Sequence, residues 1–393
     1  MIKATIILKS GKSDSIERRH PWIFSGAIKK IEGNPAEGDL VEVVSNKNEF
    51  LGLGHYQNGS IAVRIISFEK TTINNDFWKN KIQSAFNLRK NIGLIENPKT
   101  NTYRLIFAEG DGLPGLVVDI YNKTAVIQAH SLGMHQNRQI ISEMIEDTLN
   151  PQIENIYYKG EDSLPRNNDT SVKNEFLLGN LSEDIVLENG LQFKVNWVDG
   201  QKTGFFIDQR ENRFLVGKYA QGKNVLNTYC YTGGFSVYAL ANGAKHVDSV
   251  DSSKKAMELT DLNIELNHFT QNHQSHTDDA MDFLSNIEKP YDMIILDPPA
   301  FAKHIDVRHR AVSGYKRINL MALNKIAHGG ILFTFSCSQV IDPRLFESTI
   351  LSAAILAKRN VRVLHHLSQP ADHPFSIYHP EGRYLKGLVL FVE

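Results

Sequence analysis

The sequence predicts a multidomain protein with a small β-rich barrel, a central α+β domain and a C-terminal Rossmann-like α/β domain whose sheet is mostly parallel. Short β-rich runs broken by turns fill residues 1–70, whereas strands alternate with helices from about residue 185. The length of 393 residues, at roughly 150 per domain, also corresponds to two to three domains. We therefore predict domains at residues 1–72, 73–184 and 185–393.

Composition excludes several classes of protein. Hydrophobic residues make up 41% and charged residues 22% of the chain, which is typical of a globular protein with full-sized cores. Lys and Arg number 43 and Asp and Glu 44, so the overall charge of −1 indicates no particular partner. Two cysteines exclude a disulfide framework and fit a reducing compartment. No signal peptide or membrane-spanning segment is predicted, so we expect a cytosolic protein.

In the first domain, we expect strands at residues 4–8, 39–44, 49–56 and 61–67. Seven Lys or Arg residues and two acids lie between Lys3 and Lys30, with Arg18, Arg19 and Trp22 in the middle. Basic side chains beside an aromatic ring could contact phosphates and stack on a base. The alternative interpretation is a solvated surface beside a buried Trp.

The central domain follows a linker near residues 70–76. Apolar spacing predicts helices at residues 77–94 and 135–150. Between these helices, residues 103–130 read as two or three strands joined by a Gly/Pro turn, and residues 155–160 read as another strand.

The third domain begins with a predicted hairpin at residues 185–197 that contains an Asn-Gly turn. The strands and helices that follow alternate, which indicates a doubly wound parallel sheet. The expected strands are 224–231, 246–251, 291–297 and 329–336, with a further strand ending near Asp279. The expected helices are 235–243, 254–267 and 280–286, and a long helical region follows residue 301.

A glycine turn follows the first strand of this domain. Gly233 and Gly234 would let backbone N–H groups approach a ligand closely, and Asp251 follows Gly233 by 18 residues, near the offset of an acid that binds ribose hydroxyls. This pair fits either a dinucleotide or S-adenosylmethionine (SAM). The pattern is not G-x-G-x-x-G, which disfavours a nicotinamide cofactor.

Two later acids favour SAM. Asp279 ends the third strand, where its side chain could reach an adenine amino group. Asp297 precedes Pro298 and Pro299, which rigidify the loop at the end of the fourth strand and suit it to hold a planar nucleobase. The alternative for Asp297 is a capping role in a tight turn. Together with the glycine turn, these strand ends predict a SAM-dependent methyltransferase.

Cys337 follows the next strand and is the candidate nucleophile. Carbon 5 of a pyrimidine is a poor nucleophile, but attack of a thiolate on C6 makes C5 able to accept a methyl group. Asp297 could then donate or share a proton at N3. The alternative for Cys337 is a small buried hydrophobic residue. Cys230 reads as packing or pocket lining, and Ala300 stands where some cytosine-C5 enzymes carry a second cysteine.

The loop and helix after Asp297 are basic. Within residues 301–320, five Lys or Arg residues accompany one acid, so this segment could contact an RNA backbone or could simply be a solvated helix face. The five residues are Lys303, Arg308, Arg310, Lys316 and Arg317.

Long segments of the chain resemble the bacterial 23S ribosomal RNA cytosine-C5 methyltransferases, from one end to the other. The segments that carry the resemblance are RRHPWIF (18–24), EGDGLPGLVVD (109–119), KTGFFIDQRENR (202–213), NTYCYTGGF (227–235), LDPPAF (296–301), FTFSCS (333–338) and ADHPFSIYHPEGRYLKGL (371–388). The resemblance implies an N-terminal PUA RNA-binding domain, SAM as cofactor, ribosomal RNA of the large subunit as partner, and a homodimer. No metal is predicted.

The resemblance also implies the site residues. Cys337 takes the position of the family's nucleophile and Asp297 lies beside it. The residues expected to bind SAM are Phe205, Asp208, Arg210, Tyr229, Tyr231, Thr232, Gly233, Gly234, Phe235, Asp251, Ser252, Asp279, Ala280 and Asp297.

Two other functions remain open at this point. One is methylation of another base, at guanine N7 or an exocyclic amine, which needs no thiol. The other is an RNA-binding ribosome assembly factor whose methyltransferase domain is inactive.

Overall fold

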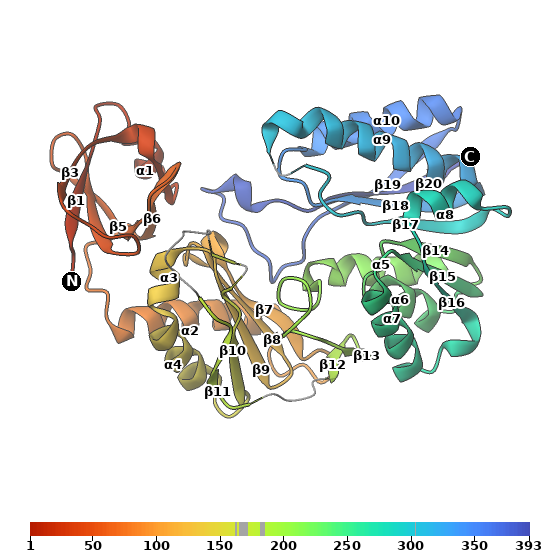
Figure 1. Ribbon diagram of the computed structural model, residues 1–393, viewed down its shortest axis with the longest axis horizontal. Helices are drawn as coiled ribbons and strands as arrows, with labels where there is room; N and C mark the ends of the chain where they lie inside the picture. The colour runs from red at the N-terminus through yellow and green to blue at the C-terminus, as the bar shows by residue number, and fades with distance from the viewer. Residues whose placement is uncertain (162, 165–171, 181–184, 303) are drawn as a thin grey trace. The chain divides into compact units, whose positions relative to one another are not determined.

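In the computed structural model, the chain forms two compact units (Figure 1). All residues are described except 162, 165–171, 181–184 and 303. Unit 1 comprises Met1–Val186, Val195–Ile207 and Ala371–Gly382. Unit 2 comprises Leu187–Lys194, Asp208–Pro370 and Arg383–Glu393. The predicted boundary at residue 184 lies close to the first boundary between the units, while the division into three domains stays a prediction.

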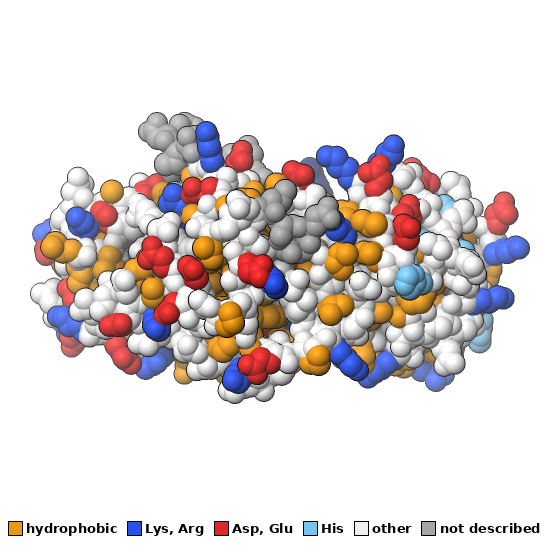
Figure 2. Space-filling model, turned by 90° about the horizontal axis from the view of Figure 1, so that it is seen from below, with side chains coloured by type: hydrophobic (Ala, Val, Ile, Leu, Met, Phe, Trp, Pro, Cys, Tyr) orange, Lys and Arg blue, Asp and Glu red, His pale blue; other side chains and the backbone are white. Residues whose placement is uncertain are grey.

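The surface carries charges of both signs. On the face drawn in Figure 2, Lys and Arg side chains are interspersed with Asp and Glu, as the small net charge suggests. Among the described residues, no helix has the length and apolar character needed to cross a bilayer.

Unit 1 begins with a six-stranded sheet in the order β2-β6-β5-β4-β1-β3. Its strands are β1 (Ala4–Leu8), β2 (Trp22–Phe24), β3 (Ile28–Gly33), β4 (Leu40–Val44), β5 (Phe50–Tyr56) and β6 (Ile61–Ser67), and a short helix α1 (Asp14–Glu17) follows β1. The four predicted strands are confirmed as β1, β4, β5 and β6. The sequence analysis missed β2, which has three residues, and β3, whose residues are all at least partly exposed and whose pattern is therefore weakly apolar.

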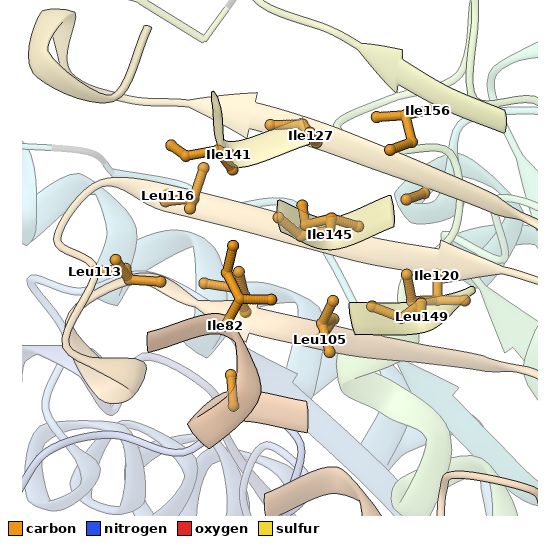
Figure 3. Close-up of a cluster of buried hydrophobic side chains, with 14 of the residues drawn as sticks. Ile82, Leu105, Leu113, Leu116, Ile120, Ile127, Ile141, Ile145, Leu149 and Ile156 are labelled. Atoms are coloured by element: carbon orange, nitrogen blue, oxygen red, sulfur yellow. The ribbon is translucent and has the colours of Figure 1, made fainter. Parts of the chain in front are cut away.

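A second sheet of unit 1 has the order β11-β10-β9-β8-β7. Its strands are β7 (Thr102–Phe107), β8 (Leu116–Tyr121), β9 (Thr124–Ala129), β10 (Asn155–Tyr158) and β11 (Glu175–Leu178). Helices α2 (Asn75–Asn91) and α4 (Arg138–Leu149) pack on it through buried aliphatic side chains such as Ile82 and Ile145 (Figure 3). The predicted helices are confirmed, while the short helix α3 (Leu132–Gln136) and β11 were not predicted.

Unit 2 contains a seven-stranded sheet in the order β16-β15-β14-β17-β18-β20-β19. Its strands are β14 (Asn224–Thr228), β15 (His246–Asp251), β16 (His273–Thr277), β17 (Tyr291–Leu296), β18 (Ile326–Ser336), β19 (Val361–Leu367) and β20 (Lys386–Val392). β14, β15, β16, β17 and β18 run parallel to one another, whereas β20 runs antiparallel to both β18 and β19. The predicted, mostly parallel sheet is thus confirmed.

Helices cover both faces of this sheet (Figure 1). They are α5 (Arg210–Ala220), α6 (Gly234–Ala241), α7 (Lys254–Leu266), α8 (Ala280–Asn286), α9 (Arg308–Lys325) and α10 (Pro343–Ala357). Tyr315 and Ile318 of α9 and Phe346 of α10 pack with Leu332 of β18 in one buried cluster. The hairpin of β12 (Ile185–Glu188) and β13 (Leu191–Lys194) turns at Asn189 and Gly190, both of which have positive φ, as the predicted Asn-Gly turn requires.

Candidate active site

The candidate residues of unit 2 follow the carboxyl ends of adjacent parallel strands. β14 pairs with β15 on one side and with β17 on the other, so the direction of winding reverses at β14. Ligands bind in such sheets at the carboxyl ends beside this switch point. Tyr229 follows β14, Asp251 ends β15, Asp297 follows β17 and Cys337 follows β18. The topology therefore brings these predicted residues to one edge of the sheet.

The turn after β14 is held in an unusual backbone conformation. Tyr229, Tyr231 and Gly233 have φ of 54°, 49° and 74°, and this is why β14 ends at Thr228 rather than at residue 231 as predicted. Left-handed φ at non-glycine residues costs about 1–3 kcal/mol each and concentrates at functional sites. The N–H of Tyr231 donates to Asp251 Oδ2 at 3.0 Å, so the turn and the end of β15 are joined directly.

Helix α7 supports the same turn from behind. Thr260 Oγ1 donates to the carbonyl of Tyr231 at 2.9 Å, and Asn263 Nδ2 donates to the carbonyl of Thr232 at 2.9 Å. A Cβ built on Gly233 would lie 2.7 Å from Thr260 Cγ2, so the turn fits against α7 only with glycine at this position. Helix α6 begins at Gly234, and its N-terminus, with buried Thr232 and Phe235 beside it, belongs to the same edge.

Two further acids lie near Tyr229. Burial raises the pKa of the Tyr229 hydroxyl, and the negative charges of Asp279 and Asp251 raise it further. Asp279 caps α8, because its Oδ1 accepts from the N–H groups of Met281 and Asp282 at 2.8 and 3.1 Å. Ser252 is exposed after Asp251, and Ala280 is buried after Asp279.

A hydrogen bond ties the loop of Cys337 to the loop of Asp297. Ser338 Oγ donates to the carbonyl of Ala302 at 2.6 Å, and both residues are buried. Cys337 itself is partly exposed, unlike Cys230, so it does not fit the alternative of a buried packing residue. Burial raises the pKa of Tyr315 on α9, a hydrogen bond with Ser336 opposes this rise, and negative charge on Cys337 or Asp297 adds to it.

Asp297 has a partner on α5 that the sequence analysis missed. Gln209, which is buried and immediately precedes α5, donates from Nε2 to Asp297 Oδ2 at 3.0 Å. Asn212 Nδ2 in turn donates to Gln209 Oε1 at 2.6 Å, which fixes the orientation of the Gln209 amide. Gln209 lies inside the segment KTGFFIDQR, so the segment was a usable signal even though the residue was not singled out.

Three other predicted cofactor residues come from that segment. Asp208 accepts a hydrogen bond from Tyr384, and Arg210 is buried, with its Nε 3.6 Å from Glu211 Oε1. Phe205 belongs to unit 1, where its carbonyl accepts from Tyr121 Oη at 3.4 Å, so its part in this site stays a prediction.

Cys230 is a packing residue. It is 6% exposed, and its sulfur lies 3.5 Å from Met257 Sδ. Burial and the charge of Asp251 raise the pKa of its thiol, so it stays protonated.

The residues predicted to contact RNA divide between the units. In unit 1, Arg18 and Arg19 are exposed, but Trp22 is only partly exposed and its Nε1 donates to Glu109 Oε1 at 2.8 Å. Phe24, two residues after Trp22, is 50% exposed, so its ring is more accessible than that of Trp22 to stacking by a base. In unit 2, Arg308, Arg310 and Arg317 of α9 are exposed and Lys316 is half-buried, while Lys303 lies outside the described residues.

The site fits SAM in the chemistry of its groups. The turn from Tyr229 to Gly233 and the N-terminus of α6 provide backbone N–H groups and a glycine where a side chain would collide. Asp251 ends β15 and Asp279 follows β16, so both carboxylates lie at the carboxyl ends of neighbouring strands. Carboxylates accept hydrogen bonds from hydroxyl and amino groups.

Comparison with known proteins identifies the family of the chain. Residues 6–68 match a family model described as a PUA-like domain, and residues 166–378 match one described as an S-adenosylmethionine-dependent methyltransferase. The chain is 39% identical to ribosomal RNA large subunit methyltransferase I of Aeromonas hydrophila, with 99% of each chain covered. It is 38% identical to the protein of the same name from Pseudoalteromonas atlantica, again over 99% of each chain.

Solved structures share the fold over the whole chain. A candidate SAM-dependent methyltransferase from Streptococcus mutans has a TM-score of 0.85 at 24% identity, and a candidate methyltransferase in complex with SAH has a TM-score of 0.86 at 24% identity. Each comparison covers 100% of both chains. The architecture of a PUA-like β domain followed by a methyltransferase domain is thereby confirmed. The chain belongs to the family of SAM-dependent methyltransferases that includes ribosomal RNA large subunit methyltransferase I.

Proposed function

We propose that this SAM-dependent methyltransferase forms 5-methylcytosine in 23S ribosomal RNA, with Cys337 as nucleophile and Asp297 beside it. The proposal depends on the observation that the loops of these two residues lie next to each other. They follow adjacent parallel strands, and the Ser338–Ala302 hydrogen bond joins their loops. The relatives named as large-subunit rRNA methyltransferases support ribosomal RNA as the substrate.

In the proposed reaction, the Cys337 thiolate forms a bond from sulfur to C6 of the cytosine, and the displaced π electrons gather at C5. When bound, SAM would supply the methyl group for C5 and would become S-adenosylhomocysteine, whose sulfur keeps the electron pair of the broken sulfur–methyl bond. A base then removes the C5 proton, the electron pair returns to the C5–C6 bond, and the bond from sulfur to C6 breaks to release the thiolate.

Asp297 would share a proton at cytosine N3 while the adduct exists. Gln209 supports this role, because its hydrogen bond to Oδ2 holds the carboxyl group in one orientation. Asp251, Asp279 and the turn from Tyr229 to Gly233 would hold the cofactor, with Asp208 and Arg210 toward its methionine end.

The test is replacement of Cys337 by Ala, followed by bisulfite sequencing of the ribosomal RNA. We expect the variant to lose 5-methylcytosine formation by a factor of about 10³ or more, because the other cysteine, Cys230, is buried and its thiol stays protonated. Undiminished methylation would contradict the nucleophile role. Mass spectrometry of the nucleosides would reveal methylation of another base, which is the first alternative. Failure to bind SAM in a calorimetric titration would favour the second alternative, an assembly factor.

We also propose a cytoplasmic homodimer. Leu351, Ile355 and Leu356 of α10 are 60%, 66% and 57% exposed, and such a cluster of exposed apolar side chains is typical of an association surface. Light scattering of the purified protein should give twice the mass of the 44.3 kDa chain, and a monomer would contradict the proposal.

A further inference from the structure

A buried lysine lies beside the candidate nucleophile. Lys386 is the first residue of β20 and is directly opposite Ser336 in the antiparallel pairing of β18 and β20. Its Nζ donates to the carbonyl of Ser338, the residue after Cys337, at 2.7 Å. The ammonium group is therefore anchored on the loop of Cys337.

The surroundings of Lys386 explain why its charge acts on the cysteine. The residue is 6% exposed, so little water screens it. Burial lowers the pKa of the Lys386 ammonium to about 8. Negative charge at Cys337 and at Asp342, the N-cap of α10, opposes this decrease, whereas the positive charge of Arg383 adds to it. The attraction between Lys386 and Cys337 is mutual, because a cation that a thiolate stabilises also stabilises the thiolate.

Two other described residues near Cys337, Tyr315 and Asp297, do not supply a positive charge. Tyr315 of α9 is neutral near pH 7, since burial raises its pKa, and Asp297 would repel a thiolate. We propose that Lys386 is a positioning residue that acts through Cys337: its ammonium group stabilises the thiolate and holds the Cys337 loop through Ser338. The proposal rests on the proposed function, because only a reaction through a C6 adduct needs this thiolate.

The test measures the titration of Cys337 without RNA. The rate of alkylation by iodoacetamide is followed from pH 6 to 10, with the Cys337 peptide quantified by mass spectrometry, so that reaction at Cys230 does not interfere. In the wild type, we expect half-maximal reactivity well below the ordinary thiol value of about 8.5. Half-maximal reactivity at or above that value in the wild type would overturn the proposal without any variant.

Three variants separate charge from structure. Lys386→Met removes the charge and the hydrogen bond, Lys386→Gln keeps a donor without the charge, and Lys386→Arg keeps the charge. We expect Met and Gln to slow alkylation at pH 7 about tenfold, which corresponds to a shift of one pH unit in the thiol titration, and Arg to restore most of the rate. A purely structural role predicts rescue by Gln rather than Arg, and that result would overturn the proposal.

Lys325 provides the matched control. Its Nζ donates to the carbonyl of Ile287 at 2.8 Å, the same kind of bond, but it immediately precedes β18 and so lies at the opposite end of that strand from Cys337. Lys325→Met should leave the alkylation profile unchanged, and an equal shift in this variant would contradict the proposal. Absence of 5-methylcytosine from the RNA, with the titration as expected, would count against the proposed function and not against the effect of Lys386 on the Cys337 thiolate.

Discussion

At the scale of single residues, the site depends on side chains that hold the reacting groups. Asp297 and Cys337 were predicted from their places after apolar strands, but Gln209, Ser338 and Lys386 were not. These residues lie within segments that carry the family resemblance, but their residue type does not show what each of them contacts. Their partners lie 88, 36 and 48 positions away in the chain, so only the folded structure brings them into contact.

Gln209→Ala should lower the methylation rate without abolishing SAM binding. The variant loses the hydrogen bond to Asp297 Oδ2 and so leaves the carboxyl group less well oriented. A single hydrogen bond to a charged group contributes about 1.5–3 kcal/mol, which corresponds to a rate lower by about 10- to 100-fold. Single-turnover kinetics measure this rate. Gln221→Ala, at the exposed C-cap of the same helix, is the control, and an equal loss in both variants would disprove the role.

At the scale of elements, strand ends are predictable, but the backbone between elements is less so. Short apolar runs were sufficient to predict β14, β15, β17 and β18, because the interiors of these strands are buried on both faces. They were not sufficient for the length of β14, because the left-handed φ of Tyr229 and Tyr231 has no signature in residue type. Helix α10 and the strands β19 and β20 were also not predicted, and β20 inserts between β18 and β19 in a way that no local pattern specifies.

Gly233→Ala should disrupt the turn that we assign to SAM. An added Cβ would meet Thr260 Cγ2 at 2.7 Å in a residue with φ of 74°, so the turn must shift away from α7. We expect the affinity for SAM, measured by calorimetry, to fall by tenfold or more.

Gly222→Ala is the matched control for this substitution. Gly222 has a similar φ of 71°, but an added Cβ there would have no neighbour within 4 Å among the described residues. The control therefore carries only the backbone strain of about 1 kcal/mol. Equal loss of SAM affinity in both variants would show that the packing of Gly233 on α7 does not matter.

At the scale of the whole molecule, the chain leaves and re-enters its compact units. The segment Ala371–Gly382 belongs to unit 1 although it lies within the predicted methyltransferase domain. Asp372 is fully buried there: its carbonyl accepts from Arg89 Nη2 at 2.7 Å, and its Oδ2 accepts from the N–H of Arg104 at 3.0 Å. These partners are separated by more than 250 residues in sequence, so the sequence analysis assigned the segment to its neighbours in the chain.

The stability of both units should fall in mild acid. Burial lowers the pKa of His55 in unit 1 and of His273 in unit 2 to about 4. The unfolded chain binds these protons near pH 6.5 and the folded chain does not, so stability is lost as the pH falls from 6.5 toward 4.

Replacement of one of these histidines measures its share. Between pH 6.5 and 5, His55→Gln should reduce the slope of the unfolding free energy against pH by up to about 1.4 kcal/mol per pH unit. Urea unfolding at several pH values measures this slope. An unchanged slope would show that His55 titrates in the folded protein as it does in the unfolded chain.

Most strands and helices were predictable from the amino-acid sequence, because apolar runs and turn residues are local properties of the chain. The end of β14, and elements such as β3, β20 and α10, were not predictable in this way. The glycine turn and the three acids after successive strands also predicted a SAM-dependent methyltransferase, which the comparisons confirm, while the role of the cysteine stays a prediction. The tertiary structure alone decided which side chains support these groups and which segment returns to unit 1. Those choices depend on pairing, burial and charge between residues that are far apart in the chain.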